Sequence, residues 1–201
     1  MHPTRTSILT AAQRLFHERG FHATSMADLL AASGTGAGSL YYHFKSKDAV
    51  LAAVLDHLHV RLDREVLAVG RAAGLSPVGR VLAIFGFYRS FLTATHCRLG
   101  CPVGNLAGEL ADSAPEIAAG LHRLFAAWRA GIADCLKPVA DHLPPHLTLD
   151  DVTTFVLTVM EGAVMQARVA RDLAPFDRSV RALTDWFHHL FPDDHASRPG
   201  A

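Results

Sequence analysis

The sequence predicts an all-α fold. Apolar residues recur at intervals of three and four along most of the chain, which is the period of an amphipathic helix, and no segment alternates like a half-buried strand. Serine, threonine, glycine and proline divide this pattern into nine segments, because they stand where helix caps and terminators are expected. The chain has 201 residues, 50% of them hydrophobic, which is enough for a core and at most two small domains.

The first two predicted helices lie at the amino terminus. The first ends at Gly20, a residue suited to the position just past a helix terminus. Its apolar face consists of Ile8, Ala12, Leu15 and Phe16. Thr24 or Ser25 caps the second helix, and Ser25 with Asp28 has the spacing of a capping box. Met26, Leu29 and Leu30 form its apolar face, and Gly34 ends it.

A short third helix is expected over about residues 37–43. Ser46 then caps a long fourth helix, and Asp48 stands in its first turn, where a negative charge favours the helix dipole. The apolar face of this fourth helix consists of Val50, Leu51, Val54, Leu55, Leu58, Leu62 and Val66.

Three helices follow in the middle of the chain. Ser76 and Pro77 supply a cap and a first-turn proline for the fifth helix. Its apolar face consists of Val81, Leu82, Phe85, Tyr88 and Leu92. A short sixth helix spans about residues 103–110, and Ser113 opens a seventh that ends near Lys137. The apolar face of the seventh consists of Leu121, Leu124, Phe125 and Trp128.

The last two helices follow a proline-rich loop. Thr148 and Asp151 form another capping-box pair before a long helix that runs through Arg171. Pro175 opens the final helix, which ends at Pro192.

These last two helices carry more apolar surface than a single short chain is expected to cover. The segment 152–170 is apolar on nearly every side, and the final helix carries one apolar stripe. That stripe consists of Phe176, Val180, Leu183, Phe187 and Leu190. Because a helix that is apolar all round is buried all round, we expect residues 150–190 of two subunits to form a four-helix bundle. The alternative is a core helix within one chain.

Charge and cysteine content limit the classes of function. The net charge is zero, but residues 1–50 carry five Lys or Arg against three Asp or Glu, whereas residues 51–201 carry 14 against 16. A mildly basic amino-terminal quarter permits nucleic-acid binding. No apolar run reaches the ~18 residues of a membrane span, and the start does not resemble a signal peptide. Three cysteines without metal-finger spacing indicate a reduced, cytoplasmic protein.

The most distinctive stretch is GTGAGSLYYHFKSKD, residues 34–48. The second helix, a four-residue break and the short third helix have the layout of a helix-turn-helix that the first helix braces. Gly36 and Gly38 remove side chains where a recognition helix begins, so that its backbone can approach a DNA groove. The polar side chains suited to DNA phosphates are Tyr41, Tyr42, His43 and Lys47. Leu40 and Phe44 are expected to point into the core; the alternative is a surface turn in which the aromatic rings only pack.

At these residues the chain resembles the amino-terminal domain of TetR/AcrR-type one-component transcriptional repressors. The resemblance runs from ILTAAQRLFHERGFHATSMADLLAASG through GSLYYHFKSKDAVLAAVL, about a quarter of the chain. SLYYHF corresponds to the recognition helix and KSKDAVL to the entry into the fourth helix. Further on, GCPVGNLAGELAD and MEGAVMQARV resemble segments of a multidrug-regulator-like subset. Nine helices is also the usual number in this family.

The resemblance implies a homodimer that binds a palindromic double-stranded DNA operator. A small-molecule effector in the carboxy-terminal domain would change the spacing of the two heads and release the DNA. By likeness, Tyr41 and His43 match phosphate contacts, and Lys47 matches the phosphate contact of the fourth helix. The positions of backbone or base contacts are Thr35, Gly38 and Tyr42.

The chain departs from the family pattern at the start of the third helix. Many relatives have serine or threonine at the position of Gly36 and a basic or polar residue at Ala37. The helix therefore loses a capping side chain and one possible base reader. We expect sparse direct readout of bases, with more weight on phosphates and DNA shape.

The effector pocket is expected among the fifth to eighth helices. The candidate lining residues are Phe85, Tyr88, Leu92, Cys101, Asn105, Phe125, Trp128, Phe155, Glu161 and Met165, with Glu109 as a further polar group. Ligand sites are mostly apolar with a few polar groups. Protein cores have the same composition, so the alternative for each residue is packing.

Cys97 and Cys101 lie four residues apart beside a helix end, with His96 and Arg98 nearby to lower a thiol pKa. One hypothesis is a thiol that senses electrophiles or oxidants. The alternative is two small buried residues, since free cysteine is commonly buried.

Other classes of function have less support. No nucleophile elbow, phosphate-binding glycine loop or zinc motif is present, so we expect neither an enzyme nor a cofactor. The histidines are scattered, and no metal site is expected. A dimeric ligand carrier whose head has lost DNA binding, and an activator of the same fold, stay open.

The expected organisation is a helix-turn-helix DNA-binding domain at residues 1–48, a ligand-binding and dimerisation domain at residues 49–192, and a disordered tail at residues 193–201. The expected function is that of a ligand-responsive repressor.

Overall fold

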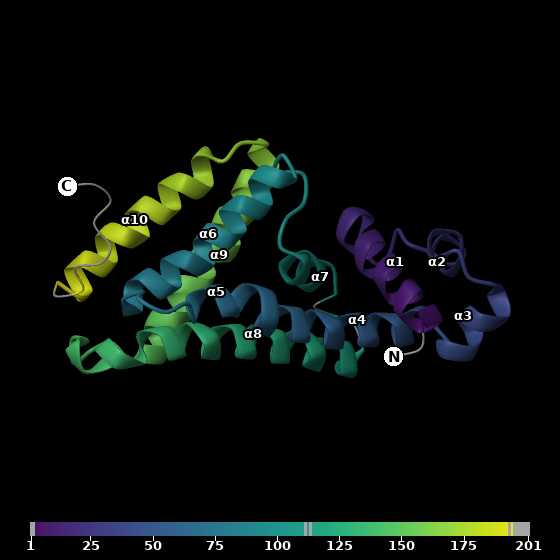
Figure 1. Ribbon diagram of the computed structural model, residues 1–201, viewed down its shortest axis with the longest axis horizontal. Helices are drawn as coiled ribbons and strands as arrows, with labels where there is room; N and C mark the ends of the chain where they lie inside the picture. The colour runs from purple at the N-terminus through teal and green to yellow at the C-terminus, as the bar shows by residue number, and fades with distance from the viewer. Residues whose placement is uncertain (1–2, 111, 113, 193, 195–201) are drawn as a thin grey trace. The chain divides into compact units, whose positions relative to one another are not determined.

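The computed structural model describes residues 3–110, 112, 114–192 and 194, and every regular element in these ranges is helical. The helices are α1 (Pro3–Arg19), α2 (Met26–Ser33), α3 (Ala37–His43), α4 (Lys47–Arg61), α5 (Ala68–Gly70), α6 (Pro77–Ala94), α7 (Pro102–Leu110), α8 (Pro115–Leu136), α9 (Leu149–Ala170) and α10 (Ala174–Leu190) (Figure 1). The predicted all-α fold is confirmed.

The helices α4 and α8 each continue into a helical stretch with a different hydrogen-bond spacing. A π-helical stretch, Leu62–Leu67, joins α4 to α5 without a break, and a 3-10 stretch, Lys137–His142, extends α8 into the segment expected to be a loop. Counted as continuous helices, the described part of the chain has nine, as predicted. None of the helices described is both long and apolar enough to cross a membrane.

The chain forms two compact units. The head unit comprises the chain up to Val60 together with Cys101–Leu124, and the body unit comprises Arg61–Gly100 together with the chain from Phe125 onward. The structural division thus differs from the expected functional one at residues 48/49, because most of α4, all of α7 and the start of α8 pack with the head. The functional division stays a prediction.

The head unit is built on three small helices. Ile8, Phe16 and Leu29 are fully buried where α1 packs against α2. Leu40 and Phe44 are buried as well, which confirms that this side of α3 faces the core. The helix α7 lies against α1 and so belongs to the same core.

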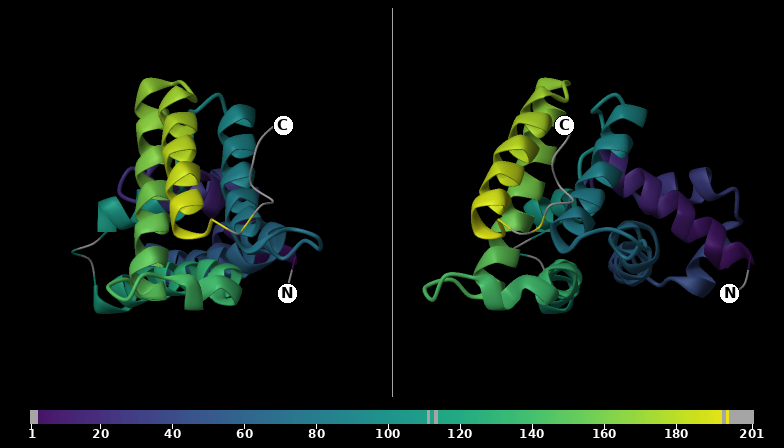
Figure 2. Two further views of the ribbon diagram at one scale, coloured as in Figure 1. Left: turned by 90° about the vertical axis from the view of Figure 1, so that its left-hand side faces the viewer. Right: turned by 60° about the vertical axis from the view of Figure 1, so that its left-hand side comes forward.

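The body unit has a larger aromatic core. Its fully buried rings belong to Phe85, Trp128, Phe176 and Phe187. The helices α9 and α10 form an antiparallel pair, which Figures 1 and 2 show side by side. An ion pair between Arg89 and Asp177, 2.8 Å apart, joins α6 to α10.

The predicted helix caps are present where the structure describes them. Ser25 and Thr148 each form a complete capping box, Ser46 accepts a hydrogen bond from the Ala49 amide, and Ser76 accepts one from Gly79. Thr24, the alternative cap of α2, is instead buried and donates its hydroxyl proton to a carbonyl oxygen. The expected cap Ser113, like residues 193 and 195–201 of the expected tail, lies outside the described residues.

Replacing Thr148 by alanine tests the start of α9. The Asp151 amide donates to the Thr148 hydroxyl at 3.1 Å, and that hydroxyl donates to the Asp151 carboxylate at 2.6 Å. Without these bonds the free energy of unfolding should fall by about 1 kcal/mol, measured by urea denaturation. Thr93→Ala, at an exposed position inside α6, is the matched control and should change it by less than about 0.5 kcal/mol. Equal effects of the two substitutions would contradict the capping role.

Candidate functional site

The outer face of α3 exposes two tyrosines. Tyr41 is 50% exposed and Tyr42 is 77% exposed, although aromatic rings of this size are usually covered. The ring of Tyr42 meets the ring of His43 edge to face, with their centroids 5.1 Å apart. Since Leu40 on the same helix is fully buried, the tyrosines are held on a short, firmly anchored scaffold. Their hydroxyl groups can donate to phosphate oxygens.

Two glycines leave the start of α3 bare. Gly36 precedes the helix in an extended conformation that any residue can adopt, and Gly38 has a negative φ like its helical neighbours. A Cβ atom at either position would meet nothing within 4 Å. Neither backbone angle nor packing therefore requires glycine, although glycine inside a helix costs about 1 kcal/mol relative to alanine. The two glycines therefore leave the backbone at the start of α3 open to solvent.

The turn before α3 also carries a hydroxyl pair. Thr35 Oγ1 lies 2.9 Å from Ser33 Oγ, and both side chains are half-buried. The two hydroxyls fix each other's position at the edge of the α3 face. Thr35 was predicted by family resemblance to contact DNA, whereas neither that resemblance nor any sequence pattern pointed to Ser33.

Lys47 has a structural contact of its own. Its ammonium donates to the Phe21 carbonyl oxygen at 2.9 Å and lies 4.2 Å from the centre of the Phe21 ring. A lysine has three N–H donors, so two are left for a phosphate. Lys45, two residues earlier, is exposed and was missed, although the KSKD stretch contains it. Both lysines stand at the amino-terminal end of α4, where the helix dipole favours an anion.

The amino-terminal end of α1 adds a further cation. The guanidinium of Arg5 lies 5.2 Å from the centre of the Phe44 ring, just past the end of α3. No sequence pattern placed Arg5 near α3, because the contact joins segments almost forty residues apart.

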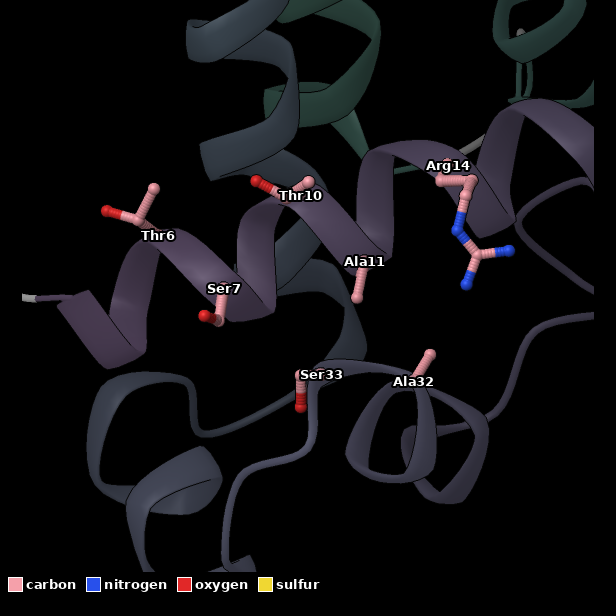
Figure 3. Close-up of a pocket in the computed structure, with 7 residues that line it drawn as sticks. All are labelled: Thr6, Ser7, Thr10, Ala11, Arg14, Ala32 and Ser33. Atoms are coloured by element: carbon pink, nitrogen blue, oxygen red, sulfur yellow. The ribbon is translucent and has the colours of Figure 1, made fainter.

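An open pocket of about 540 Å³ lies between α1 and α2 of the head unit (Figure 3). Figure 3 shows Ser7, Ala11 and Arg14 of α1 pointing toward Ala32 and Ser33 of α2. Thr6 and Thr10 complete its lining. The pocket is rich in hydroxyl donors, but its one cation, Arg14, is already paired with Glu18 at 3.1 Å.

Two members of the predicted effector set, Tyr88 and Trp128, are in contact in the interior of the body unit. Tyr88 and Trp128 stack with ring centroids 5.4 Å apart and planes 20° apart. Phe85 and Leu92 are buried on the same helix as Tyr88, while Phe125 and Glu161 are half-buried. The indole Nε1 of Trp128 is buried and has no acceptor among the described residues. A buried donor of this kind needs a partner, so it is suited to anchor a polar atom of a ligand.

Five further residues of the predicted set are either exposed on α9 or belong to the head unit. Phe155 is 47% exposed and Met165 is 63% exposed, so both lie on the surface of α9. Cys101 and Asn105 belong to the head unit. Glu109 also belongs to the head unit, where both of its carboxylate oxygens accept backbone hydrogen bonds. Helical periodicity correctly identified which helix faces are apolar, but it did not show which neighbouring segments cover those faces.

A second pocket in the body unit lies between α6 and α10 and measures about 300 Å³. Its lining includes Phe85 and Phe176, whose ring centroids are 6.2 Å apart. Arg89, Asp177 and Arg181 give the pocket a charged rim. Phe85 is the predicted effector residue that contributes to this lining.

The cysteines are not arranged as reactive thiols. Cys97, Cys101 and Cys135 are all buried. Burial raises the pKa of the Cys97 thiol, the Asp172 carboxylate raises it further, and Arg171 acts in the opposite direction. The expectation that nearby cations lower a thiol pKa is therefore wrong for Cys97, because desolvation is the larger effect. Nowhere in the described ranges do three His, Cys, Asp or Glu side chains come together as a metal site requires.

The exposed face of α9 carries an apolar stripe. Phe155, Met165 and Val169 are 47%, 63% and 81% exposed. Together with Thr158 and Gly162 they recur at alternating intervals of three and four residues, which is the spacing of a coiled-coil seam. On α9 such a stripe is suited to pack against another helix.

Comparison with known proteins gives matches along most of the chain. Residues 8–54 match the family model for bacterial regulatory proteins of the tetR family, and residues 77–183 match that for the tetracyclin repressor-like C-terminal domain. The HTH-type transcriptional repressor DhaR of Mycobacterium sp. (strain GP1) is 27% identical over 94% of this chain and 93% of its own. An HTH-type transcriptional regulator of Mycobacterium tuberculosis is 30% identical over 91% of this chain and 93% of its own.

Solved structures agree in fold. The regulatory protein TetR from Rhodobacter sphaeroides superposes with a TM-score of 0.81, at 20% identity, over 88% of this chain and 95% of that one. Both family models match this chain, and the two Mycobacterium relatives match it over nearly their whole length. This chain belongs to the tetR family of helix-turn-helix transcriptional regulators.

Proposed function

We propose that this protein is a cytoplasmic homodimeric repressor that binds a palindromic operator and is released from it by a small, mostly apolar effector. Its family makes it a DNA-binding transcriptional regulator and not an enzyme. The observation that carries the proposal is the outer face of α3, where Tyr41 and Tyr42 are exposed on a helix that Leu40 anchors in the core.

The proposed DNA interface extends from this face on both sides. Tyr41, His43 and Lys47 contact phosphates, while Thr35, Gly38 and Tyr42 contact the backbone or base edges. The bare backbone at Gly36 and Gly38 supports a close approach to the groove. Lys45 joins the phosphate contacts, because it is exposed beside the amino-terminal end of α4. With few side chains suited to base edges, DNA shape contributes to selectivity.

The proposed effector site is in the body unit beside the stacked pair of Tyr88 and Trp128. Phe85, Leu92, Phe125 and Glu161 belong to the same candidate set. The buried indole N–H of Trp128 supports an effector that carries a hydrogen-bond acceptor on an otherwise apolar body.

The proposed dimer forms through α9 and α10. The exposed stripe of Phe155, Met165 and Val169 supports this, since monomers rarely leave such a row uncovered. On α10, Arg178 and Arg181 are exposed on the first half and Asp185 on the second. An antiparallel pairing of two copies about a two-fold axis would therefore bring opposite charges together.

A ligand carrier is the second candidate. It is favoured by the missing cap and missing base reader at Gly36, because no side chain there accepts a backbone hydrogen bond. A redox sensor has less support, since the thiols are buried. An activator would use the same surfaces as a repressor.

The first experiment is fluorescence anisotropy of the protein on labelled DNA from upstream of its own gene and on a scrambled duplex, each at two salt concentrations. A repressor should bind the first DNA more tightly, with an affinity that falls as salt rises because bound phosphates release counterions. Equal, weak binding to both duplexes would contradict the proposed repressor function and favour a ligand carrier.

Lys47→Ala and Lys45→Ala should separate folding from DNA binding. Each should weaken binding to all sequences and reduce the salt slope by about 0.9, because one phosphate contact is lost. Only Lys47→Ala should also lower the free energy of unfolding, by about 1 kcal/mol, since Phe21 loses its hydrogen-bond donor. Anisotropy and urea denaturation measure the two effects. A normal salt slope in both variants would show that the lysines face away from the DNA.

Val169→Glu should convert the dimer into monomers, because a two-fold interface would receive two buried charges. Light scattering during size-exclusion chromatography measures the mass. Val60→Glu is the matched control, since Val60 is also an exposed valine, at 46%, but lies on α4 of the head unit. Loss of the dimer in both variants, or in neither, would contradict an interface on α9.

A further inference from the structure

The Glu109 carboxylate binds a turn of the head unit that lies 87 and 88 residues away in sequence. Its Oε2 accepts a hydrogen bond from the Phe21 amide at 2.8 Å, and its Oε1 accepts one from the His22 amide at 2.6 Å. Two successive N–H groups thus hold both oxygens of one carboxylate. Hydrogen bonds to an ionised acceptor are about twice as strong as neutral ones, and a paired contact also fixes direction.

The turn is shaped for this carboxylate. Gly20 has a φ of +91°, and a Cβ atom there would lie 2.8 Å from Glu109 Oε2. The backbone angle therefore favours glycine, and a larger residue there would displace the Glu109 carboxylate from the two amides. Successive amides in such a turn form a concave anion site. Lys47 donates a hydrogen bond to the carbonyl oxygen of Phe21. The turn is therefore held both by the Glu109 carboxylate and by the Lys47 ammonium.

This turn stands directly before the helix-turn-helix. Only Ala23, Thr24 and Ser25 separate His22 from the first residue of α2. Thr24 is buried and bonds back to the Gly20 carbonyl at 2.8 Å, which leaves little freedom in the connection. The position of α7 is therefore transmitted to α2 through a short, well-bonded segment.

At its amino-terminal end, α7 follows a linker that begins near Cys97, and a residue at the end of α9 donates a hydrogen bond to this linker. His96 and Cys97 both have a left-handed backbone, with φ of 49° and 52°, which non-glycine residues rarely adopt. Arg171 Nη1, at the carboxy-terminal end of α9, donates to the Cys97 carbonyl oxygen at 3.1 Å. Only four residues separate Cys97 from the start of α7. The segment that leads into α7 is therefore short, and a hydrogen bond from Arg171 holds it at Cys97.

We infer that Glu109 is a positioning residue for DNA binding: by clamping the amides of Phe21 and His22 it fixes the orientation of α2 and α3 relative to α7. The role in DNA binding rests on the proposed function, whereas the clamp itself does not. Glu109 touches no DNA in this account and acts through the turn.

The first test is hydrogen exchange of the free protein. In Glu109→Ala the amides of Phe21 and His22 should exchange at least about tenfold faster, because both acceptors are lost. Glu109→Gln, which keeps one oxygen, should have an intermediate effect. Glu116→Gln, an exposed glutamate in the same unit, is the matched control and should leave the turn unchanged. Unchanged exchange in Glu109→Ala would overturn the clamp.

The second test measures orientation. Spin labels at Ala31→Cys on α2 and Gly108→Cys on α7 occupy exposed positions, whereas the native cysteines are buried. Pulsed electron resonance should give a narrow distance distribution with Glu109 and a broader one with Glu109→Ala, at temperatures where circular dichroism shows both folded. Identical distributions would overturn the positioning role.

The third test uses the operator duplex of the anisotropy experiment. Glu109→Ala should weaken selective binding at least about tenfold, with an unchanged salt slope because no phosphate contact is removed. Unchanged affinity would overturn the role in DNA binding. If the native protein itself prefers no DNA, the proposed function fails, and exchange and distance measurements still decide whether Glu109 positions the head.

Discussion

The division of α3 into a buried side and an exposed side is the constraint on which the DNA-binding head depends. A helix of seven residues is too short to be stable alone, so tertiary packing must hold it. Leu40 and Phe44 provide that packing. Because they are fixed in the core, the opposite side of α3 is free to carry exposed tyrosines and glycines that neither backbone angle nor packing requires. The proposed DNA interface is thus the side of α3 on which core packing places no demand.

Local structure was predictable because local physics determines it. The capping boxes at Ser25 and Thr148 need only residues three apart, and both are present. Periodicity likewise identified the nine helices and the buried side of α3. The 3-10 stretch Lys137–His142 was expected to be a loop. The π-helical stretch Leu62–Leu67, which follows directly where α4 passes from the head unit to the body unit, was not predicted either. No residue type specifies such a widening, so sequence patterns do not reveal it.

Contacts between distant segments were not predictable in the same way. Periodicity shows that a face of α9 is apolar, but not whether the same chain covers it. Phe155 and Met165 were therefore assigned to the effector pocket, yet they lie on the exposed surface of α9. Lys47 was assigned to phosphate alone, although it also holds Phe21. For Glu109 the type of residue pointed to a polar ligand contact, and only the fold reveals its partners.

The clamp at Glu109 differs in kind from the packing around it. A single apolar contact is nondirectional, so the cores of the head and body constrain the orientation of their elements only through the combined packing of many side chains. Two charge-assisted hydrogen bonds from one carboxylate do specify it. Water can replace them on each side when they break, so their net contribution to stability is modest. A regulator needs a joint that defines one orientation and can still be released. A carboxylate on two backbone amides meets both requirements, which the buried core of Ile8, Phe16 and Leu29 does not.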